Sequence, residues 1–167
     1  MSTEIEPSRK KEEWEIIEDY DEKQIVEELK GHILQEYFYS FDQGGRKVVG
    51  LSYAGVKHIA RVMATNGMPL SVVETKITET PDTYRAEITV RNQATKENRL
   101  GVAEEDRFTS WKDKSGNPVR DKFALSKVVS KATRNGLRAH IDEESVKAGY
   151  KEWEASQTKT IVPKATL

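Results

Sequence analysis

The sequence of 167 residues contains no cysteine. Disulfide bonds, a thiolate nucleophile and a cysteine metal site are therefore excluded. Long apolar runs are also absent, since none approaches the roughly 18 residues that indicate a membrane span. No basic and then apolar stretch of the secretory type opens the chain. These absences predict a cytoplasmic protein without a membrane segment.

Charge dominates the composition. Charged side chains make up 33% of the residues and hydrophobic ones 36%, which suits one compact domain with a small core. The net charge of −1 conceals an asymmetry: residues 1–36 hold 12 acidic and 5 basic side chains, whereas residues 37–167 hold 16 and 22. An acidic leader before a basic body is typical of a polyanion-binding domain, although a solvated leader on an ordinary domain has the same composition.

Periodicity and turn residues predict a flexible acidic leader at 1–20, a single domain at 21–155 and a flexible tail at 156–167. Asp21 is a plausible N-cap of a first helix, and Ser52 of a second. The remaining pattern predicts strands at 33–41, 47–51, 70–78, 84–91 and 98–103, a loop at 115–118, a long helix at 121–141 and a helical stretch at 142–153. Grouped strands with flanking helices indicate an α+β fold, in which a β-hairpin, a helix, a three-stranded antiparallel sheet and a long closing helix follow one another (ββ-α-βββ-α).

One face of the predicted closing helix carries a row of four cations. They lie at offsets 0, 4, 7 and 11, within one stripe along the helix: Lys127, Lys131, Arg134 and Arg138. Like charges at this spacing repel one another by roughly 0.2–0.5 kcal/mol per pair, and the stripe itself holds no carboxylate. An anionic ligand explains such a row. Neutralisation by acidic residues of a neighbouring element or subunit is the alternative.

Two further cations, Arg46 and Lys47, follow the Gly44-Gly45 turn of the predicted hairpin and form a candidate second wall of a groove. Cations aimed at phosphates bind a nucleic-acid strand without reading its sequence. Four aromatic residues are candidates for stacking on bases: Tyr37, Phe38, Tyr39 and Tyr53. Because side chains alternate along a strand, about half of the strand aromatics are expected in the core.

Four motifs follow one another through this region: "GGRKVVGL" in the hairpin, "GVKHIARVMATNG" in the next helix, "LGVAEED" at a strand end and "SKVVSKATRNGLRAHI" in the closing helix. In these motifs, their order and the ββ-α-βββ-α succession, residues 33–141 resemble the single-strand annealing family of homologous recombination. This is the group of the eukaryotic Rad fifty-two protein and its phage and archaeal relatives. The sequence departs from the eukaryotic members at Gly50, where they have a tyrosine.

The resemblance implies a non-enzymatic protein that binds single-stranded DNA and anneals strands in homologous recombination or DNA repair. It also implies a homo-oligomer, either a ring or a helical filament, with the DNA in a positive groove between the hairpin and the closing helix. No cofactor is expected, because "DQGGRK" lacks the spacing and the strand-to-helix context of a nucleotide-binding loop.

The resemblance also assigns residues. By position, Lys47, Arg134 and Arg138 match basic residues of the family, and Lys131 is a further candidate. We expect Arg134 and Arg138 to serve DNA binding and to contribute little to folding. A further hypothesis is that the acidic leader folds back and competes with DNA for the basic groove.

Two other functions fit parts of the pattern. A double-stranded RNA-binding domain also runs α-βββ-α, but its lysines cluster at the start of the last helix and it lacks a preceding hairpin. A metal-dependent nuclease would use Glu104, Glu105 and Asp106, with Glu87 as a further carboxylate. Consecutive carboxylates on a strand point to alternate faces, so these three cannot all converge on one metal ion.

Overall fold

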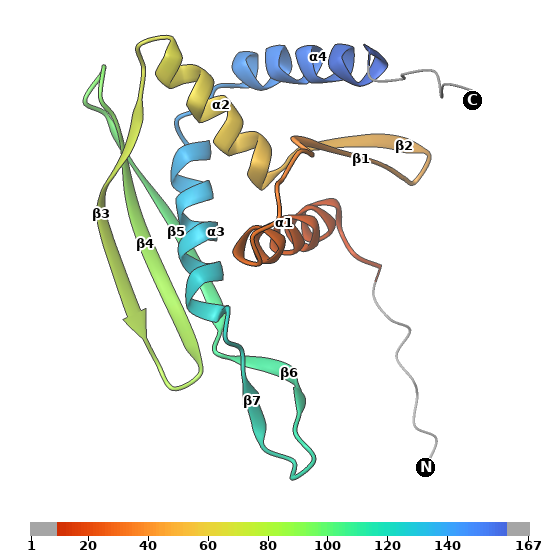
Figure 1. Cartoon of the computed structure of the whole chain (residues 1–167), viewed down its shortest axis with the longest axis vertical. Helices are drawn as coiled ribbons and strands as arrows, with labels where there is room; N and C mark the ends of the chain where they lie inside the picture. Colours follow the sequence, from red (N-terminus) through yellow and green to blue (C-terminus); the bar gives the residue numbers. More distant parts are fainter. Residues whose placement is uncertain (1–9, 160–167) are drawn as a thin grey trace.

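A computed structural model describes residues 10–159. Within this range the elements run in the following order (Figure 1): α1 (Glu13–Leu29), β1 (Phe38–Gln43), β2 (Arg46–Leu51), α2 (Tyr53–Thr65), β3 (Leu70–Glu79), β4 (Thr83–Asn92), β5 (Asn98–Asp106), β6 (Phe108–Lys112), β7 (Pro118–Arg120), α3 (Ala124–Arg138) and α4 (Glu143–Lys159). Three antiparallel units form, namely β1 with β2, β3-β4-β5 in that order, and β6 with β7. The predicted α+β fold, with its hairpin, helix, three-stranded sheet and closing helix, is confirmed.

The centre of the fold is the contact between α3 and the three-stranded sheet. Alternate residues of β4 are buried, and Ala86, Ile88 and Val90 form one cluster with Val128 and Ala132 of α3. Burial contributes roughly 1.5–3 kcal/mol for each large aliphatic side chain. This contact holds α3 against the sheet and thereby sets the direction in which its basic row points.

β5 and α3 approach each other closely at two glycines. A Cβ at Gly101 would overlap the backbone of Ala132 and Gly136, and a Cβ at Gly136 would lie 2.7 Å from Val90 Cγ2. Glycine inside a strand weakens it through conformational entropy, and such a glycine often marks a site where another backbone comes near. Here the missing side chain is what allows the helix to lie on the strand.

The start of α2 agrees with the sequence prediction. The Ser52 hydroxyl accepts a hydrogen bond from the Gly55 backbone N–H at 3.0 Å, which is the expected N-cap contact. Val56 and Ile59 of α2 then pack with Ile141, which follows α3. This second small core joins α2 to the corner between α3 and α4.

The first helix begins at Glu13 and not at Asp21, so the last eight residues of the expected leader are helical. Asp21 is buried within α1 and does not cap it. Tertiary contacts explain the longer helix. Ile25 is fully buried, and Ile17 packs against Gly50 of β2, where a Cβ would lie 2.8 Å from the Ile17 side chain. Gly50 therefore makes room for α1.

The last helix is longer than predicted, since α4 continues to Lys159 and includes the first residues of the expected tail. Aromatic rings attach it to the hairpin. The ring centroid of Phe38 lies 5.3 Å from that of Tyr150 and 5.6 Å from that of Trp153. These contacts hold the part of α4 that the sequence predicts against the hairpin.

Two parts of the prediction fall outside the described residues, namely positions 1–9 of the leader and 160–167 of the tail. Between them, no helix is both long enough and apolar enough to cross a membrane.

A short hairpin, β6–β7, precedes α3 where the sequence predicts a loop. Phe108 pairs with Arg120 and Lys112 with Pro118, with an irregular register in between. The sequence pattern does not predict these two strands, because they are short and because a proline within a run of strand-forming residues argues against a strand. Figure 1 shows this hairpin standing away from the three-stranded sheet, beyond the start of α3.

Gly101→Ala should lower the free energy of unfolding by about 3 kcal/mol, because the added methyl group overpacks a contact with backbone atoms that cannot rotate away. Urea unfolding followed by circular dichroism measures the change. Gly149→Ala in α4 is the control, since its nearest new contact would be Ile59 at 3.5 Å and stability should be unchanged or higher. Equal losses in both variants would contradict the close approach of β5 and α3.

Candidate nucleic-acid interface

The basic row of α3 faces the interior of the protein over most of its length. The side chains of Lys127, Lys131 and Arg134 are 10%, 14% and 9% exposed. Arg138, at the end of the helix, is 38% exposed. A buried charge is tolerated only when it is paired and hydrogen-bonded, so the first three cations need partners within the fold.

Carboxylates from three segments balance the two lysines. Lys127 Nζ lies 2.7 Å from Asp121, 3.1 Å from Glu22 and 3.3 Å from Glu105. Lys131 shares two of them, at 2.7 Å from Glu105 and 3.5 Å from Glu22. Acidic residues of neighbouring elements therefore neutralise this part of the row, which is the alternative that the sequence left open.

The same contacts shift the titration of the cluster. Burial alone would lower the pKa of Lys127, but its hydrogen bonds to Asp121 and Glu22 and the charge of Glu105 raise that pKa above its usual range. Burial alone would raise the pKa of Glu22, but the hydrogen bond from Lys127 and the charge of Lys131 bring it below its ordinary value of 4.5. Lys127 and Glu22 are therefore both charged at neutral pH.

Arg134 pairs with two carboxylates of α1. Its guanidinium donates to Asp21 at 2.8 Å and to Glu18 at 2.7 Å. The other oxygen of Asp21 accepts from the Tyr53 backbone N–H at 2.8 Å and from the Tyr39 hydroxyl at 3.1 Å. Burial raises the pKa of Asp21, and Arg134 only partly offsets this effect. Burial and the charge of Asp21 also raise the pKa of Tyr39. One carboxylate thus joins α1 to α3, α2 and β1.

α1 lies between α3 and the β1–β2 hairpin, where the sequence predicts an open groove (Figure 1). Its carboxylates meet the basic row on one side. On the other side Ile17 packs on Gly50, and Glu13 forms an ion pair with Arg46. The acidic segment does lie over the basic row, but as a helix that is packed into the core through Ile25. The two expected basic walls are therefore separated by α1 and do not face each other across a groove.

Three of the six candidate cations reach solvent. Lys47 is exposed on β2, and Arg46 is exposed beside it. Arg138 is partly exposed, and its guanidinium donates to Glu143 at 2.9 Å and to the Ile141 carbonyl at 2.8 Å. Because such exposed pairs contribute roughly 0–1 kcal/mol, an anionic ligand can replace them at little cost.

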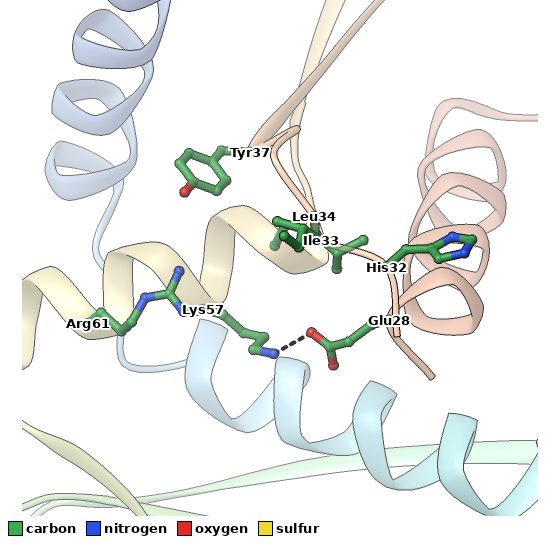
Figure 2. A pocket seen from close by; sticks show the side chains of 8 residues that line it. Glu28, His32, Ile33, Leu34, Tyr37, Lys57 and Arg61 are labelled. Carbon is green, nitrogen blue, oxygen red and sulfur yellow. Dashed lines mark hydrogen bonds and ion pairs between the residues drawn. The ribbon is translucent and has the colours of Figure 1, made fainter. Parts of the chain in front are cut away.

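A second group of cations and rings, the Tyr37 patch, consists of Tyr37, Lys57, His58 and Arg61. Three of these residues, Tyr37, Lys57 and Arg61, line a cavity of about 350 Å³ between the end of α1 and α2 (Figure 2). The Tyr37 ring stacks on His58, with 4.3 Å between the ring centroids. Lys57 pairs with Glu28 at 2.6 Å, whereas Arg61 is exposed and forms no ion pair with any described residue. Burial and the nearby charge of Arg61 lower the pKa of His58, so its ring is neutral at pH 7.

The four aromatic residues considered for base stacking have different positions. Phe38, Tyr39 and Tyr53 are buried and serve the core. Tyr37 is only partly buried, and it lines a cavity together with Lys57 and Arg61. Strict alternation does not describe this division, because Phe38 and Tyr39 are neighbours on β1 and both are buried, while Tyr37 precedes the strand.

The sequence analysis missed three members of the Tyr37 patch. A signal for Lys57 and Arg61 was present, because residues four apart on a helix lie on the same face. Their meeting with Tyr37 depends on the junction of β1 and α2, where the Tyr37 carbonyl accepts a hydrogen bond from the Ser52 N–H at 3.0 Å. Sequence spacing does not reveal a contact of this kind.

The carboxylates considered for a nuclease have different partners in the fold. Glu105 is bound to the two lysines of α3, whereas Glu104 on the same strand is exposed. Glu87 lies 3.9 Å from Lys76 and 3.6 Å from Arg85. Among residues 10–159, no group of three or more histidine, aspartate or glutamate side chains is arranged to hold a metal ion.

Arg134→Ala should lower the free energy of unfolding by about 3–5 kcal/mol, because it leaves the buried Asp21 without its cation. This predicted loss differs from the expectation, drawn from the sequence, that Arg134 contributes little to folding. Arg138→Ala, in the next turn of the same helix, should cost about 1 kcal/mol or less. Denaturant unfolding of both variants measures the difference.

A double variant separates lost charge pairing from lost packing. Combining Asp21→Asn with Arg134→Met removes both charges while the new amide can still accept from the Tyr53 N–H. The double variant should therefore regain part of the free energy of unfolding that the two single changes remove. If the double variant is as unstable as the sum of the two single changes, charge pairing does not hold these helices together.

Glu22→Gln should reduce stability by about 1 kcal/mol at pH 7, because the lysine cluster loses one carboxylate. The pKa of Glu22 is lowered in the folded state, so its contribution is present above about pH 4.5 and is lost as the pH falls through the folded pKa. The stability difference between wild type and variant should therefore shrink between pH 5 and pH 3, as thermal unfolding across this range, roughly that of carboxylate titration, will measure. Glu104→Gln, at an exposed position outside the cluster, is the control. A difference that grows on acidification would contradict the assignment.

No protein-family model matches this chain, and no curated protein or solved structure matches it either. The resemblance to the single-strand annealing family therefore rests on the motifs quoted above and on their order along the chain.

Proposed function

We propose that this protein binds single-stranded DNA without reading its sequence, and that the Tyr37 patch is part of the binding surface. The observation that carries the proposal is a partly exposed aromatic ring beside two cations on one cavity. An aromatic ring stacks on any base and a cation holds any phosphate, so together they fit an unpaired strand. A duplex keeps its bases stacked inside and cannot offer one to Tyr37 without opening.

Each member of the Tyr37 patch has a distinct role in this proposal. Tyr37 provides the stacking surface, and His58 holds its ring in position from one side. Arg61 is the main phosphate contact, because the charge of Lys57 is already balanced by Glu28. Stacking on an aromatic side chain contributes roughly 1–3 kcal/mol per base, so one such contact with several phosphate contacts gives useful affinity.

The six cations singled out in the sequence divide into two roles. The exposed ones, Arg46, Lys47 and Arg138, are proposed to contact phosphates on either side of the Tyr37 patch. The three buried cations of the basic row hold α1 against α3 and so support the surface indirectly. This division keeps the predicted DNA-binding role only for side chains that a ligand can reach.

The resemblance extends the proposal to strand annealing in homologous recombination or DNA repair, in the cytoplasm and without enzymatic chemistry or a cofactor. The resemblance also extends the proposal to a homo-oligomer, which forms a ring or a helical filament. We propose that copies meet through β3, an edge strand that exposes Val72, Val73 and Ile77. An apolar open edge is a surface that pairs readily with another chain.

Arg61→Ala should weaken binding to oligo-dT and to mixed-sequence single strands by the same factor, because phosphate contacts carry no sequence information. The slope of log affinity against log salt should fall by about 0.7, the value for one phosphate contact on a single strand. Fluorescence anisotropy with a labelled oligonucleotide measures both quantities. Arg85→Ala, at an exposed arginine of β4, is the control and should leave affinity unchanged.

One comparison tests the proposal as a whole. The affinity of the wild-type protein for single-stranded DNA, duplex DNA and duplex RNA is measured at one salt concentration. Preference for single-stranded DNA is expected. Preference for duplex RNA would instead favour a double-stranded RNA-binding domain, and cleavage of the labelled strand in Mg²⁺ or Mn²⁺ would favour a nuclease.

A further inference from the structure

The β6–β7 hairpin and the two residues after it carry cations that form no ion pair among the described residues. Four lie within eleven residues: Lys112, Lys114, Arg120 and Lys122. All four are exposed, and none of them forms an ion pair with any carboxylate in the part of the chain that the structure describes. Because the hairpin stands away from the sheet (Figure 1), its charges are open to a ligand from outside.

The two carboxylates of the same segment are already engaged. Asp113 accepts hydrogen bonds from the backbone N–H groups of Ser115 and Asn117, both at 2.9 Å, and so shapes the turn. Asp121 pairs with Lys127 at 2.7 Å and accepts a hydrogen bond from the Phe123 N–H. Neither carboxylate pairs with the four exposed cations, so the hairpin presents a positive surface.

Trp111 lies among these cations with 61% of its surface exposed. A ring at this exposure contributes little to folding, but it offers a large flat face to a ligand. Trp14 is equally exposed, at 61%, yet it stands on the acidic helix α1 and its indole N–H donates to Glu12. The two tryptophans therefore share their exposure and differ in the charge around them. Only the surroundings of Trp111 attract a polyanion.

The strand register indicates on which face of the hairpin each of these side chains lies. Lys112 follows Trp111 directly and lies opposite Pro118, and Arg120 is two residues further along β7. Residues two apart on a strand share a face, so Lys112 and Arg120 lie on the same face of the hairpin. Trp111 is next to Lys112 on β6, so its ring lies on the other face of this narrow hairpin. A strand of nucleic acid that bends around the hairpin meets the ring on one face and the cations on the other.

We infer that the β6–β7 hairpin is a second contact for single-stranded DNA, in which Trp111 stacks on an unpaired base and Lys112, Lys114 and Arg120 hold the neighbouring phosphates. The inference rests on the proposed function, because both need the same ligand. It concerns a separate surface, formed by different elements from the Tyr37 patch.

The test uses the full chain and two labelled oligonucleotides of equal length, one of oligo-dT and one with abasic sites in place of its central bases. Trp111→Ala should weaken binding to oligo-dT about fivefold or more, which corresponds to at least about 1 kcal/mol of base stacking. It should change binding to the abasic strand much less, because that strand keeps its phosphates and offers no base. Trp14→Ala is the matched control and should leave both affinities unchanged.

A charge variant tests whether the lysines of the hairpin contact phosphates. Lys112→Gln combined with Lys114→Gln should weaken binding to both oligonucleotides and lower the salt slope by about 1.4, or 0.7 for each phosphate contact. Circular dichroism should show unchanged folding, since all the altered side chains are exposed.

The outcomes separate this inference from the proposed function. If Trp111→Ala leaves oligo-dT binding unchanged while Arg61→Ala weakens it, the hairpin is not a contact and the Tyr37 patch remains. Equal losses on both oligonucleotides would exclude base stacking by Trp111. If the wild-type protein binds neither strand, the proposed function itself is wrong.

Discussion

The buried pair of Arg134 and Asp21 is the interaction on which the rest of this structure depends. Two charges that are almost fully buried are stable together only when their remaining hydrogen-bonding groups are also satisfied. Asp21 meets this condition because it also accepts from the Tyr53 backbone and the Tyr39 hydroxyl. The four residues belong to α3, α1, α2 and β1, so one carboxylate sets how four elements meet. The cluster of Lys127, Lys131, Glu22 and Glu105 joins α1, α3 and β5 in the same manner, with more access to solvent.

This arrangement determines which cations reach solvent. Inside the fold, carboxylates of α1 face and neutralise cations of α3. Cations outside this contact are exposed, among them Arg46 and Lys47 of the β1–β2 hairpin, Arg61 of the Tyr37 patch and the four cations at the β6–β7 hairpin. Two of these surfaces also present an aromatic ring, which is the combination that unpaired bases and their phosphates require.

The same contact limits what α1 can do. If the acidic leader competes with DNA for the basic row of α3, α1 must be able to move away from that row. Removal of α1 would expose Ile25, which is fully buried, and would leave Arg134 buried without a carboxylate. Both changes are costly, since burial of an aliphatic side chain contributes roughly 1.5–3 kcal/mol and an unpaired buried charge costs more. The geometry therefore favours α1 as a constant part of the fold.

The sequence by itself determined the order of the elements apart from the β6–β7 hairpin, because caps, turn residues and apolar periodicity act over a few neighbouring residues. Ser52 caps α2 as predicted, and the four cations of α3 do form one row. Only the tertiary structure decided what that row faces, since a helical period shows which residues share a face and not what the face meets. It also decided the start of α1, where burial of Asp21 against Arg134 overrides its local preference for an N-cap. The Tyr37 patch joins a strand to a helix, and such a contact between separate elements depends on packing that no local pattern encodes.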